Sequence, residues 1–372
     1  MDEEREQNRL EEAGLAVQIA VLAVLLHRLR KLDAGTTYAV ARALEAKDMA
    51  EVERILERGR DLITDRAGEV IDETAKGCDT WAAPYYAAAG RVQAPALEGM
   101  ATAQAVRTAK AAAAVSIRDM CDSHVLRLVA NDGTLMPFRQ AYRAEVDTAV
   151  RTLAQGRDTY YELLRKTAER LGGTGLRVQY ESGATRDLYS ALAQNVMDTA
   201  ARAQADIREV QGREFGADGV AVSAHAPCAP DHLDYQGREY TTAEFAELQG
   251  RLRRPIGMWN CRHTVSPVII GVSPEFHGAE ELEELRRAST APTGIKTKDG
   301  RDMTAYEFAQ WQRATETKVR QLQAQAYLCE QAGVENGAIK ARVKDLRREY
   351  GRRNRLAKIE GRPERMAVYV LE

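Results

Sequence analysis

Two segments differ in character from the rest of this sequence: SAHAPCAPDHLDYQGREY at residues 223–240 and WNCRHTVSPVIIGVSP at residues 259–274. With the residues just beyond them, they hold four of the six histidines and two of the five cysteines. Their prolines disfavour helix, whereas the flanking sequence is rich in alanine and in charged residues at helical spacing. We therefore expect a small non-helical module, the His/Cys module, between long helices.

The histidines and cysteines of this module have the layout of a metal site. Cys261 and His263 are two residues apart, so they would project from the same side of a strand. A structural zinc site needs four such donors on a few short segments. The candidate zinc ligands are His225, Cys228, His232, Cys261 and His263. The same residues could instead form a hydrogen-bonded polar cluster that fixes the loops onto a small sheet, and the sequence leaves both interpretations open.

Catalytic chemistry has less support. Asp231, Asp234 and Glu239 could act as bases beside a metal-bound water, and Cys261 with His263 could form a nucleophile pair. The sequence shows no phosphate-binding loop, dinucleotide-binding fingerprint or Ser/His/Asp arrangement. We therefore expect no enzymatic activity, and a metal-dependent enzyme acting on nucleic acid is the alternative.

The rest of the chain predicts a mainly α fold. Apolar residues recur at helical spacing on both sides of the module, and short apolar or alternating runs predict a few strands. We expect long helices that flank a small α+β module with short strands. The expected regions are a helical region at 1–130, a second at 131–215, the His/Cys module at 216–288, an exposed linker at 289–302 and a basic helical region at 303–372.

The composition of the chain limits the classes of function that it can have. The formal net charge is −2 over 372 residues, so no overall charge directs the chain to nucleic acid or to a membrane. Five cysteines without framework spacing indicate a reducing compartment with free or metal-bound thiols. The apolar run from Ala13 to Leu26 is interrupted by Gln18 and follows an acidic start. Since it is shorter than the ~20 residues of a membrane span, we expect a buried core helix, no signal peptide and no membrane partner.

The C-terminal region is locally basic. Between residues 340 and 365, eleven Lys and Arg residues stand against four acidic ones, a net charge of +7. Such a helix can face DNA or an acidic partner, and it can equally be a solvated surface. The candidate contact residues are Arg347, Arg348, Arg352, Arg353 and Arg355.

The two quoted segments resemble the phage minor capsid protein 2 family, which is distantly related to the Mu-F-like head-morphogenesis proteins of tailed bacteriophages. The shared pattern is Ser-x-His, a second His seven residues later, Gln-Gly, and Asn-Cys-Arg-His followed by Pro and Gly. Beside the candidate ligands, it maps onto Ser223, Gln236, Gly237, Asn260, Arg262, Pro267 and Gly271. One departure is Ala229, where many members carry Arg. Weaker similarities flank the module, among them Gly35–Thr37, Tyr180–Gly183, Tyr306, Gln310, Gln312, Arg313 and Glu316.

This resemblance implies a structural protein of the virion. Members are associated with the portal vertex or the capsid interior and with head morphogenesis, DNA packaging or DNA delivery. The implied partners are the portal protein, the major capsid protein and packaged double-stranded DNA. The motif residues are then expected to hold the module together, with zinc as the one cofactor that its chemistry suggests.

Overall fold

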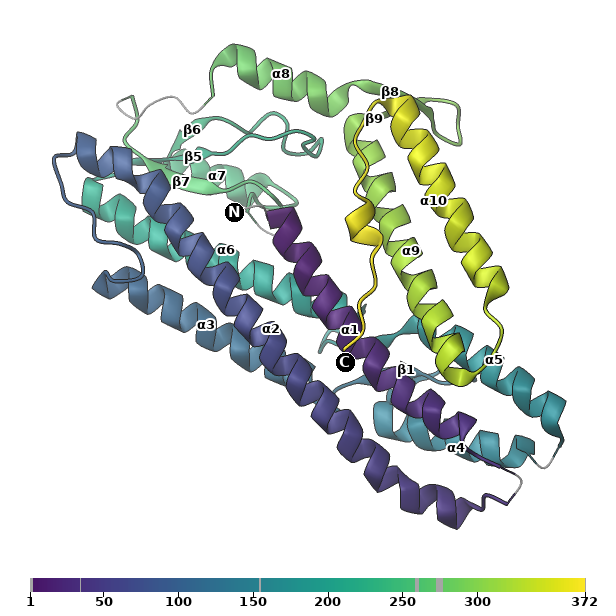
Figure 1. The fold of residues 1–372 in the computed structure, drawn as a ribbon. Coiled ribbons are helices and arrows are strands. Elements are labelled where there is room, and N and C mark those ends of the chain that lie inside the picture. The colour runs from purple at the N-terminus through teal and green to yellow at the C-terminus, as the bar shows by residue number, and fades with distance from the viewer. Residues whose placement is uncertain (1–2, 34, 154, 258–260, 272–276, 372) are drawn as a thin grey trace.

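The fold is organised around α1 (Glu3–Arg30), a long helix in the middle of the body. The computed structural model describes residues 3–33, 35–153, 155–257, 261–271 and 277–371. Helix α1 packs against three other long helices, and Figure 1 shows them side by side. These are α2 (Tyr38–Ala88), α6 (Leu188–Phe215) and α9 (Ala305–Ala332), while α3 (Met100–Met120) covers α2 and α6. The expected mainly α fold is confirmed.

The apolar run predicted as a core helix is buried within α1. Leu22, Leu25 and Leu26 are fully buried in the largest apolar cluster of the molecule. Burial of each such side chain contributes about 1.5–3 kcal/mol. Helix α1 is long and apolar enough to span a membrane by length and composition, yet 67% of its most apolar window is buried inside the protein. Its burial supports the core-helix interpretation.

Two β-hairpins form a four-stranded antiparallel sheet beside the helices. They are β1–β2 (Arg127–Val129 and Leu135–Pro137) and β3–β4 (Leu176–Gln179 and Thr185–Asp187), and β1 pairs with β3. Helix α4 (Phe138–Leu153) begins directly after β2, α5 (Arg157–Thr174) precedes β3, and α6 begins directly after β4. The sequence predicts the turn between β1 and β2 but not the two strands, which are three residues long.

A glycine with positive φ stands in the turn of each of the two hairpins, and a third hairpin shares this feature. It joins β8 (Pro292–Lys296) to β9 (Asp302–Thr304), and its Gly300 has a φ of 84°. Helix α9 begins directly after β9, as α4 and α6 begin directly after their hairpins. Residues 289–302 were expected to be an exposed linker. They instead contain a hairpin that packs on α9 and α10 and buries Ile295.

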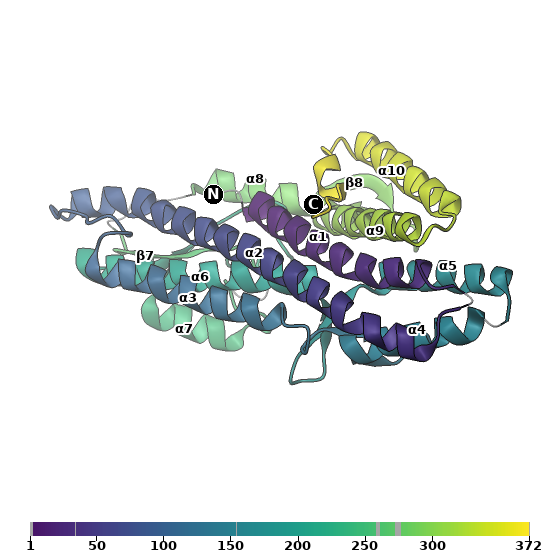
Figure 2. The same ribbon diagram turned by 60° about the horizontal axis from the view of Figure 1, so that its bottom comes forward.

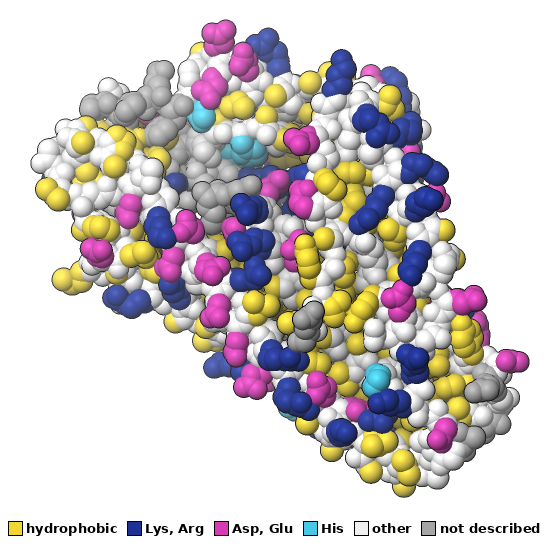
Figure 3. Space-filling model, in the orientation of Figure 1, with side chains coloured by type: hydrophobic (Ala, Val, Ile, Leu, Met, Phe, Trp, Pro, Cys, Tyr) yellow, Lys and Arg dark blue, Asp and Glu magenta, His cyan; other side chains and the backbone are white. Residues whose placement is uncertain are grey.

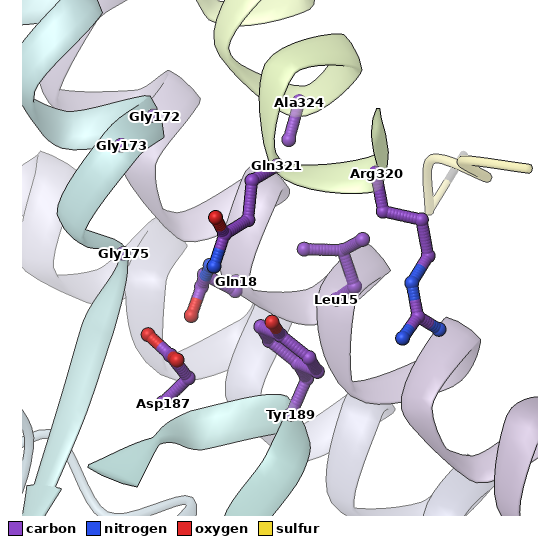
Figure 4. A pocket seen from close by; sticks show the side chains of 10 residues that line it. All are labelled: Leu15, Gln18, Gly172, Gly173, Gly175, Asp187, Tyr189, Arg320, Gln321 and Ala324. Carbon is purple, nitrogen blue, oxygen red and sulfur yellow. The ribbon is translucent and has the colours of Figure 1, made fainter. Parts of the chain in front are cut away.

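A polar junction joins α1, α9 and the second hairpin. Figure 4 shows Gln18, Gln321 and Asp187 converging there. The space between them has room for about one water molecule. Gly175 has a φ of 65°, and a Cβ on it would lie 2.6 Å from Gln18 Nε2. This junction is a packing joint between helices rather than a ligand pocket.

The His/Cys module contains a small antiparallel sheet with β5 (Gly219–Val222) in its centre, between β6 (Glu239–Thr241) and β7 (Val265–Val268). Helix α7 (Thr242–Arg251) follows β6, and α8 (Ala279–Thr290) leads into the third hairpin. Val222, Leu248 and Ile256 are buried on one face of this sheet, and Ala221 and Val268 are buried on the other face against α2 and α6.

The C-terminal region packs along α9. Helix α10 (Gly337–Ala357) runs beside α9, and a short 3-10 turn, η1 (Pro363–Met366), returns along it (Figure 1). Val319, Tyr350 and Met366 form the apolar contact between these elements. Figure 2 shows an elongated molecule with the α2–α3 connection at one end and α10 toward the other.

Candidate metal centre

The small sheet brings the two halves of the module together. Strands β5 and β7 are antiparallel, and Val222 lies opposite Val265. The chain leaving β5 and the chain entering β7 therefore meet at the same end of the sheet. Ser223 extends this ladder: its N–H donates to the Thr264 carbonyl at 2.9 Å, and its Oγ accepts from the Thr264 N–H at 2.9 Å. As a result, the His225 and His263 ring centroids lie 4.5 Å apart.

A turn at residues 231–237 supplies the third part of the site. Gly237 ends this turn with a φ of 70°, and its N–H donates to the Val222 carbonyl at 2.9 Å. Glycine suits this position because its φ is left-handed, and a Cβ there would also lie 2.1 Å from Leu282 Cδ2 of α8. The turn thereby places His232 and Gln236 against this end of the sheet, where both are buried.

The five predicted ligands come together around His263. The Cys261 Sγ lies 3.3 Å from His232 Nδ1 and 3.2 Å from His263 Nδ1. At the other nitrogen of the His263 ring, Nε2 lies 3.6 Å from the Cys228 Sγ. Two groups of three ligand atoms, each within 4.8 Å of one another, therefore share His263 and could hold a metal ion: His232, Cys261 and His263, and His225, Cys228 and His263.

Burial controls the protonation of these groups. His232 and His263 are 1% and 4% exposed, and Cys228 is fully buried. Burial lowers the pKa of His263 to about 3, helped by His225 and His232. Burial, with Arg262 and Arg313 nearby, lowers the pKa of His225 to about 4. Burial also raises the pKa of Cys228 to about 12. Both imidazoles are therefore neutral near pH 7, as metal ligation requires, and the Cys228 thiol is a poor nucleophile.

Two supporting groups could not be predicted from the sequence. The Ser289 Oγ, on the buried side of α8, accepts a hydrogen bond from the Cys228 N–H at 2.9 Å. The Arg254 backbone carbonyl lies 2.8 Å from His232 Nε2. Neither residue has a distinguishing sequence signal, because one contributes a common hydroxyl and the other contributes only its backbone.

In the sequence, Arg262 lies between the candidate ligands Cys261 and His263. Its side chain belongs to a separate ion-pair network, which we call the Glu4 network. Glu4 of α1 binds Arg262, Arg313 of α9 at 3.0 Å and Arg362 at 2.8 Å. Arg362 continues to Glu316 at 3.3 Å. Arg365 at 3.7 Å and the Tyr350 hydroxyl at 2.5 Å complete the network at Glu316. The network ties the module to α1, α9 and the C-terminal segment.

The structure shows the contacts of several residues that were noted for their resemblance to the family. Arg313 and Glu316, noted only for their resemblance to the family, are members of the Glu4 network. Pro267 packs on Gly212 of α6, where a Cβ would lie 2.5 Å from the proline ring. Gly271 has a φ of 71°. Asn260 lies outside the described residues.

The basic C-terminal patch is smaller than its sequence indicates. Arg362 and Arg365 are held inside the Glu4 network, and Arg365 is buried. Of the predicted contact residues, Arg348 pairs with Asp345, Arg352 and Arg353 with Glu349, and Arg347 with Gln323.

Four exposed cations of this region have neither an ion pair nor a side-chain hydrogen bond among the described residues: Arg342, Lys344, Arg355 and Lys358. Figure 3 shows Lys and Arg side chains along the side of the molecule formed by α10.

The geometry of the module agrees with the family motif. No curated protein and no solved structure matches this chain. The family model described as Phage minor capsid protein 2 matches residues 20–352, which include the whole His/Cys module and most of the helical body. The chain therefore belongs to the phage minor capsid protein 2 family and is a structural protein of a bacteriophage head.

Proposed function

We propose that this protein connects the shell of the phage head to its contents, binding the portal or capsid protein at one end and packaged double-stranded DNA along the side formed by α10. The observation that carries the proposal is the unequal chemistry of these two surfaces, which are well separated in an elongated molecule (Figure 2). The elbow between α2 and α3 exposes large apolar side chains, and the side formed by α10 exposes cations (Figure 3). Its place in the virion would be the capsid interior or the portal vertex, where it acts in head morphogenesis, DNA packaging or delivery.

The apolar end is the elbow between α2 and α3. Val92 is 96% exposed and Met100 is 91% exposed. The elbow has a fixed shape, because the Asp79 carboxylate accepts hydrogen bonds from the Ala96 N–H at 2.8 Å and from the Gln93 amide at 3.2 Å. A rigid loop that holds large apolar side chains in water is suited to contact another protein.

The cationic surface is the outer face of α10. Val343, Leu346 and Tyr350 turn toward α9. Lys344 and Arg355 stand on the opposite side at helical spacing, exposed and without an ion pair among the described residues. Such cations neutralise phosphates and release counterions, which gives affinity for DNA without sequence preference.

Co-purification tests the protein-binding end. We expect the wild type to co-purify with the portal or capsid protein and to be detected by mass spectrometry in purified virions. The double variant Val92→Asp/Met100→Asp should lose most of that binding. Val40→Asp, at the opposite end of α2 and 49% exposed, is the matched control and should bind normally. Virions that lack this chain, or equal binding by both variants, would contradict the proposal.

Measurement of DNA binding at several salt concentrations tests the cationic surface of α10. Changing Arg342, Lys344, Arg355 and Lys358 to Gln should weaken binding to duplex DNA and flatten its dependence on salt. The matched control changes four exposed cations elsewhere: Lys31, Lys47, Arg151 and Arg202. Binding that is absent, insensitive to salt or equally weakened in the control would exclude a DNA role for α10.

The burial of the His/Cys cluster supports a structural role over the alternative, a metal-dependent enzyme acting on nucleic acid. A substrate phosphate would have to reach His232 or His263, and both are almost completely covered. The enzyme alternative requires metal-dependent nuclease turnover that His232→Ala abolishes. We expect no such turnover in the wild type.

A further inference from the structure

The hydrogen bonds around His232 fix which of its nitrogens carries the proton. Its Nε2 lies 2.8 Å from the backbone carbonyl of Arg254, and a carbonyl oxygen can only accept. The proton of the neutral ring is therefore on Nε2. The Nδ1 lone pair is left free, and it faces the Cys261 Sγ at 3.3 Å.

The same reasoning fixes the proton of His263. Its Nε2 lies 3.2 Å from the side-chain oxygen of Gln236. The orientation of that amide is set independently, because the His225 backbone N–H can only donate and lies 3.1 Å from the same oxygen. Nε2 of His263 is therefore the donor, and its Nδ1 lone pair also faces the Cys261 Sγ, at 3.2 Å.

Two nitrogen lone pairs thus converge on one sulfur that carries at most one proton. A Cys261 thiol can donate to one of the two Nδ1 atoms and leaves the other without a donor in a buried site, which is costly. A transition-metal ion such as zinc removes this conflict, because a thiolate and two neutral imidazoles are donors it prefers. Each histidine already gives its single N–H, on Nε2, to a carbonyl oxygen, as metal-bound histidines usually do.

We propose that His232 Nδ1, Cys261 Sγ and His263 Nδ1 supply three ligands to one divalent transition-metal ion, with zinc as the expected metal and a water molecule as its fourth ligand. A tetrahedral zinc ion holds sulfur and nitrogen ligands roughly 3.5 Å apart, given bonds of about 2.3 and 2.0 Å. The observed 3.2 and 3.3 Å therefore require the ligands to open by a few tenths of an ångström. This inference is independent of the partners proposed above.

The rival ligand group, His225, Cys228 and His263, makes a different prediction. It would use Nε2 of His263, which is the nitrogen that donates to Gln236. Metal at that position would displace this hydrogen bond and move the ring proton of His263 to Nδ1, where it faces the Cys261 Sγ. The two cysteines therefore distinguish the two groups.

Elemental analysis of protein purified without chelator, loaded with zinc and desalted, tests the ligand set. The wild type should hold about one zinc per chain. Cys261→Ala should hold less than about a tenth of an equivalent, because three good ligands become two. Cys228→Ala and Cys329→Ala, both at fully buried cysteines, are the matched controls and should keep the ion. Wild-type protein without zinc, loss of zinc from Cys228→Ala, or retention by Cys261→Ala would overturn the proposal.

Two further measurements do not depend on the folding of a cysteine variant. Cobalt(II) in the wild-type protein should give tetrahedral d–d absorption and a sulfur-to-metal charge-transfer band, and the absence of that band excludes Cys261 as a ligand. Gln236→Leu removes the acceptor that fixes His263, so zinc affinity should fall about 10–100-fold. Gln249→Leu, which removes an amide bound to the Ile256 backbone in the same module, should bind zinc as the wild type does. Equal affinity in all three proteins would refute the role given to Gln236.

Discussion

The helical body and the His/Cys module are stabilised in different ways. The body buries α1 within a large continuous apolar cluster, so no single polar contact decides its structure. The module has only two small apolar clusters, one on each face of its sheet, and depends on a few directed contacts at one end of that sheet. Loss of packing should therefore lower the stability of the whole body gradually, whereas loss of one polar group should disorder a specific part of the module.

The largest expected effect is in the body. Leu22→Ala creates a cavity at the centre of α1 and should lower the free energy of unfolding by about 2–5 kcal/mol, measured by urea denaturation. Leu356→Ala, on the exposed side of α10, should change it by less than about 0.5 kcal/mol. If Leu22→Ala proves equally neutral, the body does not depend on α1 as the structure indicates.

Metal removal should act on the module alone. If free zinc is held about 100-fold above its dissociation constant, chelation removes about 2.7 kcal/mol from the stability of the elements that bind it. Hydrogen exchange should therefore accelerate in β5 and β7 and remain unchanged in α1 and α6. Equal acceleration in both regions would show that the two are not independent.

The Glu4 network should make the junction between body and module sensitive to acid. Burial opposes ionisation of Glu4, but Arg262 and Arg362 outweigh it and lower the pKa from 4.5 to about 2. A lowered folded-state pKa contributes stability above about pH 4.5, and this contribution is lost as the pH falls toward 2.

Because Glu4 is partly exposed, we expect a loss of about 1–2 kcal/mol between pH 6 and pH 3. Urea unfolding of Glu4→Gln should lack this part of the pH dependence. Glu6→Gln, whose partner is the exposed Arg9, should retain it.

A smaller effect is expected at Ser223. Ser223→Ala leaves the Thr264 N–H without its acceptor and should cost about 1 kcal/mol. The same change should weaken zinc binding, because it loosens the ladder at Thr264, directly after the proposed ligand His263. Ser182→Ala, in the exposed turn between β3 and β4, removes a comparable local contact and should do neither. A normal zinc affinity in Ser223→Ala would show that the ladder does not position the ligands.

The candidate site was predictable to the level of residue types but not of atoms. The prolines and the His/Cys spacing mark the module, and all five predicted ligands lie together. The choice among them depends on the Gln236 amide and the Arg254 carbonyl, whose orientations arise only in the folded chain. The exposed charge of the basic region was overestimated for a related reason: Arg362 and Arg365 count as surface charge in the sequence, but they form ion pairs with Glu4 and Glu316, which are distant in the sequence.

The strands show where local patterns stop being informative. β1 and β2 are three residues long, and β1 gains its second partner from β3, about 50 residues later. The hairpin at residues 292–304 shares its glycine turn with the two earlier hairpins, and comparison of the three turns could have replaced the expected linker with strands. Helix α1 was the easiest element to predict, because burial on nearly all sides gives it a continuous apolar run.

The Glu4 network also bears on how the chain folds. Glu4 and Arg362 are 358 positions apart, so the ion pair between them closes only after nearly all of this sequence has left the ribosome. Contacts of such long range form late, because the chain entropy of closing the loop opposes them. Before residue 362 is available the chain could still bury α1, but Glu4 would be left with Arg262 and Arg313 alone, and Glu316 would lack both of its arginine partners. The junction between the body and the His/Cys module is therefore completed only when residue 362 has joined the fold.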